Sequence, residues 1–434
     1  MIIHIVQSGE TIESIANSYG VPVNRLIIDN DLNNFNALVL GQTIVIAIPE
    51  KTYVVMEGDT VESIADKNGI SIRELLQNNN FLYNRNFIFP GETLIISYGT
   101  FSNVVNTNGY AYPFIDFNIL KRTLPYLTFI SIFGYLIKAD GNIESVADYD
   151  LLNISRLYQV SPILLLSAQN IQGNIDLEVA FRVLYDEEVQ ENLLNNIFEI
   201  LKSKNYAGVN VTYQFIDKNN IEYYNNLTIK LYARLHYAGY LVFITLPHNK
   251  IIIDHEVTFE RFDYSVIGRY CDGITIMNYN WGYSYGPPAP VSSIADLKEV
   301  LNYVLTQVPP EKIDLGIPII GYDWELPYII GVSKARSLTI SSAINLASEF
   351  GAVILFDETS QTPYFEYIDP RGGIPTRHIV WFVDARSINS LMILVDEYKL
   401  RGSGIWNIMY FYAQMWLVIN SQNEIVTNEP EINL

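Results

Sequence analysis

The fold of this chain is decided by one short stretch, Ala207-Gly208-Val209-Asn210-Val211-Thr212-Tyr213-Gln214-Phe215. Its side chains alternate between apolar and polar, which predicts a β-strand, and the strand ends on polar residues. Apolar residues at helical spacing precede the stretch over 189–204 and follow it over 221–236. A strand between two amphipathic helices is typical of a parallel α/β fold.

The same alternation runs from about residue 104 to residue 434. Strands are predicted at 109–112, 128–133, 163–167, 208–214, 241–246, 273–277, 313–319 and 404–407. Helices are predicted at 120–124, 147–159, 188–204, 221–235, 259–271, 293–307, 340–350 and 388–400. This pattern predicts a TIM (β/α)8 barrel, with its chemistry at the carboxyl ends of the strands. Alternating segments at 353–357 and 364–367 predict a β-hairpin in a small α+β insertion, about residues 321–390.

The first hundred residues hold a repeated module. The same eight-residue pattern occurs twice, as Gly9-Glu10-Thr11-Ile12-Glu13-Ser14-Ile15-Ala16 and as Gly58-Asp59-Thr60-Val61-Glu62-Ser63-Ile64-Ala65. Self-similarity of this kind marks duplicated units, and each unit reads β-α-α-β with a threonine as the first helix cap. The predicted domains are 1–49, 50–98, a linker at 99–108, and the barrel at 109–434.

The repeated signature closely resembles the LysM domain, which binds N-acetylglucosamine-containing glycans. The resemblance implies a shallow groove between the Gly-Glu-Thr loop and the loop after the second helix. The matching residues are Gly9, Glu10, Thr11, Asp29 and Asn30 in the first unit, and Gly58, Asp59, Thr60, Asn78 and Asn79 in the second. Two alternatives stay open, because threonines here also cap helices and asparagines also build turns.

The large domain resembles glycoside hydrolase family 18, in particular its two-LysM, spore-peptidoglycan branch. The resemblance covers nearly the whole domain. Its motifs are Met277-Asn278-Tyr279-Asn280-Trp281-Gly282, Gly321-Tyr322-Asp323-Trp324-Glu325-Leu326-Pro327-Tyr328, Trp381-Phe382-Val383-Asp384-Ala385-Arg386-Ser387 and Gly404-Ile405-Trp406-Asn407.

The catalytic motif of that family is degenerate in this sequence. The fourth strand reads D-x-D-x-E in the family, or N-x-D-x-E in the spore enzymes, and here Asn210, Thr212 and Gln214 occupy these positions. The resemblance implies a glutamate that protonates the leaving oxygen and an aspartate that orients the substrate acetamide. An amide has no titratable proton near neutral pH, and threonine carries no charge. Loss of acid–base catalysis alone costs roughly two to four orders of magnitude in rate. No catalytic residue is therefore intact.

The sequence nevertheless keeps the side chains expected of a sugar-binding cleft. The predicted glycan-binding residues of the barrel are Gln214, Met277, Tyr279, Trp281, Tyr322, Asp323, Trp324 and Trp406. Core packing is an open alternative for Trp281 and Trp324. We predict a glycan-binding protein without turnover. The first alternative is an active N-acetylglucosaminidase that uses a displaced carboxylate such as Asp323. The second is a spore-coat scaffold whose cleft is a relic.

The composition excludes several function classes. The formal net charge of −20 argues against binding to nucleic acid and to anionic membranes. The single Cys271 excludes an intrachain disulfide, and we interpret it as a small buried residue. We expect no cofactor and no metal, because the adjacent residues Asp254-His255-Glu256 rarely converge on one ion.

The family resemblance also implies partners and a location. We expect peptidoglycan or N-acetylglucosamine oligomers as ligands, and other spore-coat proteins as further partners. The location expected is the spore coat, spore cortex or cell wall of a spore-forming bacterium. The first residues lack a basic segment followed by an apolar run, so no secretory signal is predicted.

Overall fold

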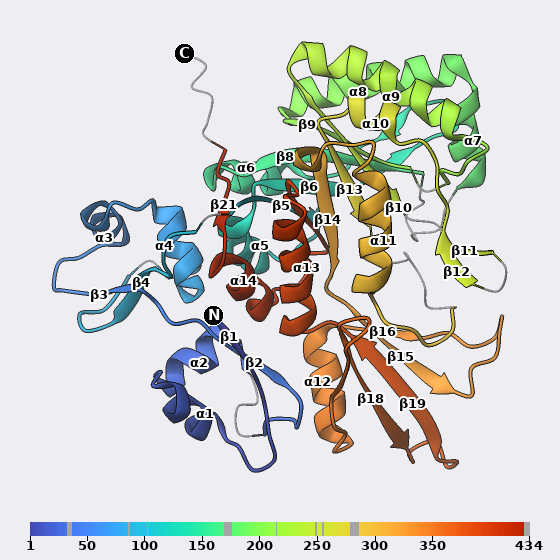
Figure 1. Ribbon diagram of the computed structural model, residues 1–434. Helices are drawn as coiled ribbons and strands as arrows, with labels where there is room; N and C mark the ends of the chain where they lie inside the picture. Colours follow the sequence, from blue (N-terminus) through green and yellow to red (C-terminus); the bar gives the residue numbers. More distant parts are fainter. Residues whose placement is uncertain are drawn as a thin grey trace.

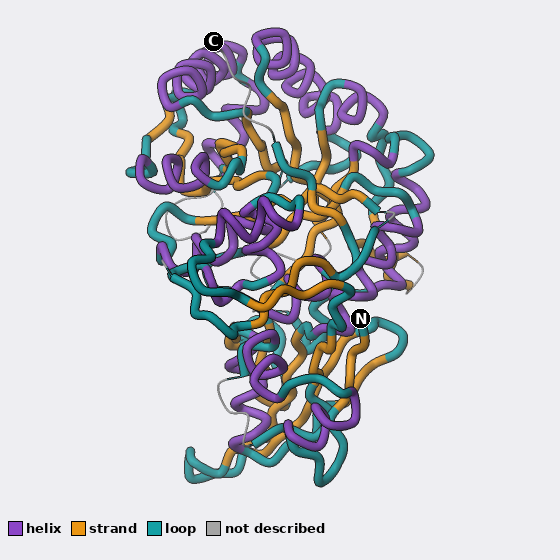
Figure 2. Tube along the Cα trace, turned by 90° about the vertical axis from the view of Figure 1, so that its left-hand side faces the viewer, coloured by secondary structure: helices purple, strands orange, loops and turns teal. Residues whose placement is uncertain are grey.

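The computed structural model describes residues 1–32, 37–85, 87–101, 103–168, 176–213, 215–247, 250–253, 256–277 and 286–428. Figure 1 shows two small modules at the amino end, a large barrel, and an insertion beneath the barrel. Figure 2, seen from a second side, shows a broad upper body and a narrower lower one.

Each amino-terminal module folds as the predicted β-α-α-β unit. The first holds β1 (Ile2–Ile5), α1 (Ile12–Tyr19), α2 (Val23–Asp29) and β2 (Thr43–Ile46), and the second holds β3 (Lys51–Val54), α3 (Val61–Asn68), α4 (Ile72–Asn78) and β4 (Thr93–Ser97). The two strands of each module pair antiparallel. Thr11 and Thr60 cap α1 and α3, because each hydroxyl accepts the N–H of a serine three residues on, whose hydroxyl bonds back.

The large domain is the predicted (β/α)8 barrel. Its strands are β5 (Val104–Ala111), β6 (Phe129–Ile137), β8 (Ser161–Ser167), β9 (Gly208–Thr212), β10 (Leu241–Pro247), β13 (Gly273–Met277), β14 (Ile313–Pro318) and β20 (Gly402–Trp406). They pair in parallel, and β5 bonds to both β6 and β20, which closes the ring. Two short strands, β7 (Ile143–Glu144) and β21 (Glu424–Ile425), pair outside it.

Helices surround the ring in Figure 1. They are α5 (Phe117–Thr123), α6 (Tyr149–Leu157), α7 (Leu177–Tyr185), α8 (Glu187–Lys204), α9 (Ile221–Leu235), α10 (Ser265–Arg269), α11 (Ile294–Val304), α13 (Ala385–Glu397) and α14 (Ala413–Asn420). The predicted helix at 259–271 is wrong over its first half. There β12 (Glu256–Phe259) pairs with β11 (Lys250–Ile253), and Asp263 accepts the N–H of Ser265, which starts α10 only at that point. Sequence patterns did not predict α7 or α14.

The insertion contains the predicted hairpin within a larger sheet. Its strands are β15 (Gly321–Leu326), β16 (Arg336–Leu338), β17 (Leu355–Asp357), β18 (Thr362–Asp369) and β19 (Thr376–Phe382), with α12 (Ile340–Glu349) between β16 and β17. They run antiparallel in the order β16-β15-β19-β18-β17. In Figure 1, α12 lies on the side of this sheet that faces the first module.

The first LysM module docks through the loop and strand that end it. Val39 and Val45 are buried in the same apolar core as the barrel. The carbonyl of Leu40 accepts the N–H of Ile354 at 2.9 Å. Gln414 of α14 donates to the Thr43 carbonyl at 2.7 Å. The module is therefore fixed to both the barrel and its insertion.

The second module docks through a different surface, its helix α4. Arg73 is 7% exposed and donates to the carbonyl oxygens of Pro125 and Leu127. Burial lowers the pKa of its guanidinium to about 10. Gln77 donates to the same Pro125 carbonyl at 2.6 Å. The hydrogen bonds from this buried cation to carbonyl oxygens fix the module to the barrel through α4.

Two smaller findings concern the chain as a whole. Among the described residues, no helix has the length and apolar character that a bilayer span requires. Cys271 is buried, and burial raises the pKa of its thiol to about 12, so it stays protonated as predicted for a core residue.

A pair of equivalent glycines tests the docking of the first module. Gly41 and Gly91 both have positive φ, +85° and +91°, so alanine strains both backbones alike. A Cβ on Gly41 would overlap the carbonyl of Ile354, whereas one on Gly91 meets nothing within 4 Å. Gly41→Ala is expected to lower Tm by roughly 2–4 °C more than Gly91→Ala, the shift for about 1 kcal/mol in a large domain. Calorimetry on both variants measures the difference, and equal shifts would contradict the docking contact.

Candidate functional site

The first motif position lies in a buried network without formal charge. Asn210 of β9 is fully buried, and its amide donates to the Tyr110 hydroxyl at 3.2 Å. Its carbonyl oxygen accepts the Thr245 hydroxyl at 2.9 Å. The Tyr110 hydroxyl lies 3.2 Å from the hydroxyls of Thr245 and Thr275. Burial raises the pKa of Tyr110, which keeps its phenol protonated. Four strands thus meet through neutral groups only.

The barrel wall carries almost no carboxylate. Within the eight barrel strands, all of them described, Asp314 is the only Asp or Glu. Asp314 is the second residue of β14, at the amino end of the ring and far from the mouth. There Arg401 binds its carboxylate through Nε and Nη2. Asp314 therefore forms a structural ion pair with Arg401, at the end of the barrel opposite the predicted catalytic positions.

The second motif position, Thr212, ends β9 and is 9% exposed. Because side chains alternate along a strand, Thr212 shares the inner face of Asn210, while Val211 and Tyr213 point to the helix side. A pocket of about 420 Å³ borders this strand end between β9 and the helices α7 and α9, and its lining residues are all uncharged: Ile137, Ser167, Ala168, Ala180, Val183, Leu184, Val211, Thr212, Tyr213, Phe215, Tyr224 and Leu227. Gln214, the third motif position, lies outside the described residues.

An aromatic cluster surrounds Trp406 at the end of β20. Its ring centroid lies 5.6 Å from that of Tyr110, 6.4 Å from Tyr112 and 5.9 Å from Phe133. Tyr112 also stacks on Phe114, which is 76% exposed. Sequence reasoning found Trp406 but missed Tyr112, Phe114 and Phe133. The signal was available, because Tyr112 follows β5 directly and strand ends carry function in a barrel.

The other predicted barrel residues have different outcomes. Trp324 is 1% exposed and its indole N–H donates to the Gly286 carbonyl at 2.9 Å, so the predicted sugar-stacking role is wrong for it. Met277 is 2% exposed at the end of β13. Tyr322 is half-buried beside Trp324, with ring centroids 5.6 Å apart. Tyr279 and Trp281 lie outside the described residues.

Asp323 is engaged within the insertion sheet. It is 7% exposed, and its two oxygens accept the Tyr367 hydroxyl at 2.9 Å and the His378 ring nitrogen at 3.0 Å. Tyr367 and His378 stack on each other with centroids 4.6 Å apart. Both oxygens of this carboxylate are therefore engaged by side chains of the insertion sheet.

Asp217, the carboxylate nearest in sequence to the motif, is also engaged. Its Oδ1 accepts the N–H groups of Asn219 at 2.7 Å and Asn220 at 3.0 Å. These bonds form the turn that leads into α9. Asp217 therefore has a structural task at the start of that helix.

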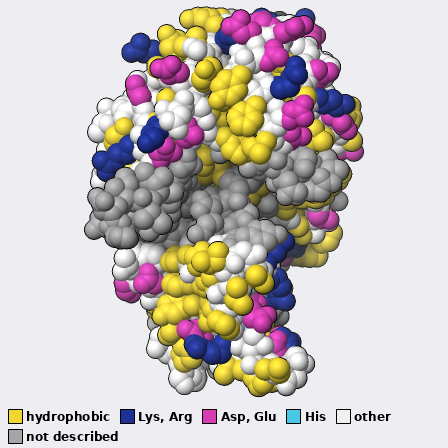
Figure 3. Space-filling model, turned by 90° about the vertical axis from the view of Figure 1, so that its right-hand side faces the viewer, with side chains coloured by type: hydrophobic (Ala, Val, Ile, Leu, Met, Phe, Trp, Pro, Cys, Tyr) yellow, Lys and Arg dark blue, Asp and Glu magenta, His cyan; other side chains and the backbone are white. Residues whose placement is uncertain are grey.

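Apolar side chains lie on both sides of the undescribed segments in Figure 3. On the upper side, where α7 lies in Figure 1, the helix exposes Leu177 (54%), Phe181 (54%) and Tyr185 (47%). Phe181 and Tyr185 stack with centroids 5.9 Å apart. The rim of the barrel thus presents apolar rings on a face otherwise mixed in charge.

In the two amino-terminal modules, two asparagines predicted to contact sugar instead make hydrogen bonds within their own module. Asn30 and Asn79 are 6% and 0% exposed. The Asn30 amide donates to Leu26 and Val45 carbonyls and accepts the Val45 N–H. Asn79 makes the same three bonds with Leu75 and Ile95. Each asparagine joins the second helix to the last strand, so a glycan role is wrong for both.

Their neighbours also face the protein. Asp29 is 6% exposed in an ion pair with Arg25 at 2.8 Å. Asn78 donates to the Ile96 carbonyl and accepts Asn420 of α14 at 2.9 Å. The predicted glycan contact is therefore wrong for the buried Asp29, whereas Asn78 is half-buried and its glycan contact stays a prediction.

The acidic residues of the two Gly-Glu-Thr loops hold their own turns. Asp59 accepts the Met56 N–H and the Tyr53 hydroxyl, both at 2.8 Å, and Lys67 at 2.5 Å. These bonds, that from Lys67 first, lower the pKa of Asp59 to about 2. Glu10 likewise accepts the Gln7 N–H at 2.7 Å. What remains exposed of the predicted grooves is Gly9, Thr11, Gly58 and Thr60.

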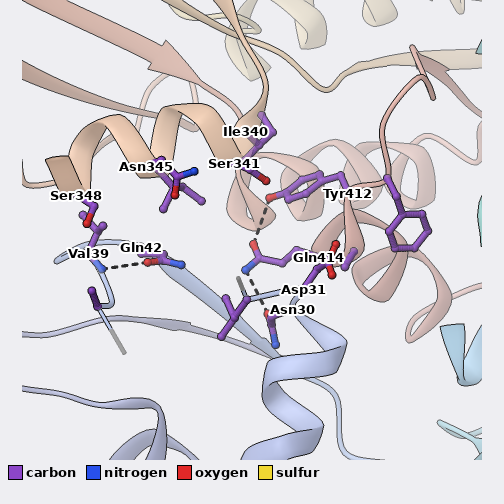
Figure 4. Close-up of a pocket in the computed structure, with 15 residues that line it drawn as sticks. Asn30, Asp31, Val39, Gln42, Ile340, Ser341, Asn345, Ser348, Tyr412 and Gln414 are labelled. Carbon is purple, nitrogen blue, oxygen red and sulfur yellow. Dashed lines mark hydrogen bonds between the residues drawn. The ribbon is translucent and has the colours of Figure 1, made fainter. Parts of the chain in front are cut away.

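A pocket of about 680 Å³, partly open to solvent, lies where the first module meets α12 and α14 (Figure 4). Asn345 and Ser348 of α12 line it opposite Gln42. On another side, Gln414 accepts the Tyr412 hydroxyl and donates to Asn30. The pocket is thus a gap in the docking surface, bordered by amides that already serve the contact.

Known protein families match this chain over most of its length. Residues 169–410 match the family Glycosyl hydrolases family 18, and residues 4–47 and 53–97 match the LysM domain. The chain belongs to glycosyl hydrolase family 18. Its two amino-terminal modules are LysM domains.

Relatives of the same length carry both parts. The chain is 32% identical over 432 residues to the Cortical fragment-lytic enzyme of Bacillus subtilis (strain 168), covering 98% of this chain and 99% of that one. It is 30% identical to the Putative sporulation-specific glycosylase YdhD of the same organism, over 96% of this chain and 98% of that one. The crystal structure of the Bacillus megaterium QM B1551 spore cortex-lytic enzyme SleL superposes with a TM-score of 0.79 at 29% identity, covering 98% of both chains.

Asp323→Asn tests whether this carboxylate is structural. The amide keeps the shape but turns an N–H₂ group toward the donor of Tyr367 or His378, so a buried polar group loses its partner. We expect a loss of about 1–3 kcal/mol in unfolding free energy. Affinity for N-acetylglucosamine tetramer should stay within about twofold, a change of less than 1 kcal/mol.

Glu325→Gln on the same strand is the matched control, because Glu325 is exposed. Thermal melts and calorimetric titration of both variants separate the two roles. An Asp323→Asn protein that melts like the wild type but no longer binds the tetramer would place Asp323 in the ligand site instead.

Proposed function

We propose that this protein binds N-acetylglucosamine-containing glycan, such as peptidoglycan, without hydrolysing it. The observation that carries the proposal is the combination of Gln214 at the family's proton-donor position with a barrel whose strands hold no carboxylate except Asp314. The protein would act as a pseudo-glycosidase of the spore or cell wall.

The chemistry of the family requires a proton that this barrel does not supply. Family 18 enzymes are an exception to the two-carboxylate scheme, since the substrate's own acetamide acts as nucleophile. They still need an acid that gives a proton to the leaving oxygen and takes one back. Gln214 can donate a hydrogen bond to that oxygen, but its amide cannot transfer the proton. Thr212 offers a hydroxyl where a charge would stabilise the intermediate.

Features that serve binding are retained in the described residues. Trp406, Tyr112 and Phe133 form an aromatic cluster at the strand ends, and Phe114 extends it to the surface. Aromatic rings stack on the apolar faces of sugars, and neutral hydrogen-bonding groups suit an N-acetylated ligand. Binding without cleavage therefore needs no group that the barrel lacks.

The second candidate function is an active cortex-lytic hydrolase, because relatives named as cortical fragment-lytic enzymes are 32% identical over nearly the whole chain. It needs a carboxyl within hydrogen-bond reach of the glycosidic oxygen, about 2.6–3.2 Å. Asp323, the displaced carboxylate named as the alternative acid, and Asp217, the carboxylate nearest in sequence to Gln214, are both engaged in structural hydrogen bonds. This weakens the hydrolase candidate relative to the binding one.

Location and partners follow from the relatives by analogy. The cortex-lytic names of the Bacillus relatives favour a place in the spore cortex, spore coat or cell wall, with peptidoglycan as ligand. Contacts with other spore-coat proteins belong to the same proposal. A protein that binds cortex glycan without cutting it would cross-link or protect the strand.

The wild-type protein is expected to bind N-acetylglucosamine tetramer and peptidoglycan fragments without releasing reducing ends. Calorimetric titration measures the binding, and a reducing-end assay on the same sample measures turnover. Trp406→Ala should weaken the binding by roughly tenfold, as expected when an aromatic anchor is removed from a contact. Release of reducing ends at an enzyme-like rate would overturn the proposal.

Restoring the two carboxylates should restore activity. In Thr212→Asp with Gln214→Glu, the glutamate supplies the proton and the aspartate orients the acetamide. We expect a gain of roughly two to four orders of magnitude over the parent. The isosteric single change Gln214→Glu is the intermediate case, and Thr212→Asn with Gln214 unchanged is the matched uncharged control. A parent that is already as active as the double variant would refute the missing-acid argument.

A further inference from the structure

The last loop of each LysM module has the same backbone in both repeats. In the first, the Val39 N–H donates to the Gln42 side chain at 3.0 Å, and the Gln42 N–H donates to the Val39 carbonyl at 2.9 Å. In the second, Phe89 and Glu92 make the same two bonds at 3.0 and 3.1 Å. Val39 and Phe89 are therefore equivalent positions, and the two surroundings can be compared directly.

These surroundings differ completely. Val39 is 5% exposed and belongs to the core that continues into the barrel. The next two residues of the first loop, Leu40 and Gly41, touch Ile354 of the insertion. In the second module, Phe89 is 55% exposed, and a Cβ on Gly91 would meet nothing within 4 Å. Val39 of the first loop is covered by the protein itself, and only Leu40 beside it keeps 37% of its surface exposed, while Phe89 of the second loop faces solvent.

The exposed loop of the second module carries an ordered aromatic group. Phe87 is 60% exposed, and its ring meets that of Phe89 edge to face with centroids 5.1 Å apart. The Arg85 guanidinium lies 6.0 Å from the Phe87 ring, 5.6 Å from Phe89 and 5.7 Å from Phe81. Glu92 binds Arg85 at 2.8 Å. We call Arg85, Phe87 and Phe89 the aromatic platform.

The chemistry of the platform favours a neutral, flat ligand. Two phenylalanines that are more than half exposed lose the stability that burial would give, so their position is better explained by a ligand than by folding. The charge of Arg85 is balanced by Glu92, which makes a strongly anionic ligand a poor match. Aromatic and arginine side chains together are typical of binding hot spots. The face of an N-acetylated sugar offers the matching C–H groups and amide.

We propose that the two LysM domains have different roles in this chain: the first is a clamp that fixes the insertion to the barrel, and the second binds the glycan strand through its aromatic platform. The inference rests on the proposed glycan-binding function and adds which module makes the contact and with which side chains. The clamp role follows from Val39, Leu40 and Gly41, which all take part in the docking contact.

The experiment compares full-length variants in co-sedimentation with purified peptidoglycan sacculi. Phe87→Ala with Phe89→Ala should weaken binding by roughly tenfold or more, the effect of losing a hot spot. The control is Tyr237→Ala, which removes a ring that is 83% exposed on the barrel just after α9 and should bind like the wild type. Arg85→Lys keeps the charge but loses the planar stack, and it should give an intermediate loss. Thermal melts of all variants confirm that the chains are folded.

The outcomes are distinguishable. Wild-type binding together with unchanged binding of the Phe87/Phe89 variant overturns the platform, even if the protein cuts no glycan. Retained sacculus binding with loss of binding to another protein would make the platform a protein contact and likewise overturns the proposal. A wild type that binds no sacculi overturns both this inference and the glycan-binding function. Release of reducing ends refutes only the absence of turnover and leaves the platform supported.

Discussion

The uncharged hydrogen-bond network around Asn210 is the constraint from which the rest of the barrel's chemistry follows. Asn210, Tyr110, Thr245 and Thr275 join four strands through neutral groups that satisfy one another. A carboxylate at this buried position would have to be desolvated among neutral groups, because Arg401 is bound by Asp314 at the amino end of the ring. Asparagine also stands at this position in the spore enzymes that the motif resembles, so the network is compatible with either function. The acid belongs to the third motif position, Gln214, and the polar groups around Asn210 serve packing and orientation.

The docking of the first LysM domain has a similar logic. Its last loop, its last strand and Asn30 all have bonds that extend into α14 or the insertion, so module and barrel share one core. The second domain is held at the opposite side of its fold, by Arg73 on carbonyl oxygens. Two modules that share the signature from Gly9 to Ala16 and from Gly58 to Ala65 thus present different faces. What separates them is the last loop, where Val39 is 5% exposed against the barrel while Phe89 is 55% exposed.

Much of the fold could be predicted from the sequence, because each strand is a short run of β-branched and apolar residues between amphipathic helices. The helix at 221–235 and the strand at 273–277 have the predicted bounds. The helix prediction for 259–271 failed over its first half, because its apolar spacing suits a helix, whereas Phe259 pairs with Lys250 of the preceding strand and α10 starts only at Ser265. The functional site was harder to predict. An asparagine after a helix is typical of a turn or of a ligand contact, and only its bond to Val45, in the strand 15 residues further along, shows that the Asn30 amide points inward. The sequence allowed Trp324 to lie either in the core or in the sugar-binding cleft, and only its burial in the structure decides for the core.

A rigid connection between a wall-binding module and a barrel changes what slow or absent turnover means. Binding at two sites on one strand makes the second contact intramolecular, which raises the overall affinity far above that of either site. For a hydrolase this is a disadvantage, since each cut must be followed by release and a new encounter. For a protein that stays on the strand it is an advantage, and it increases as the connection stiffens. The second LysM domain, whose Arg73 and Gln77 bond to carbonyl oxygens of the barrel, has such a fixed connection, which agrees with the proposal that the barrel holds its glycan.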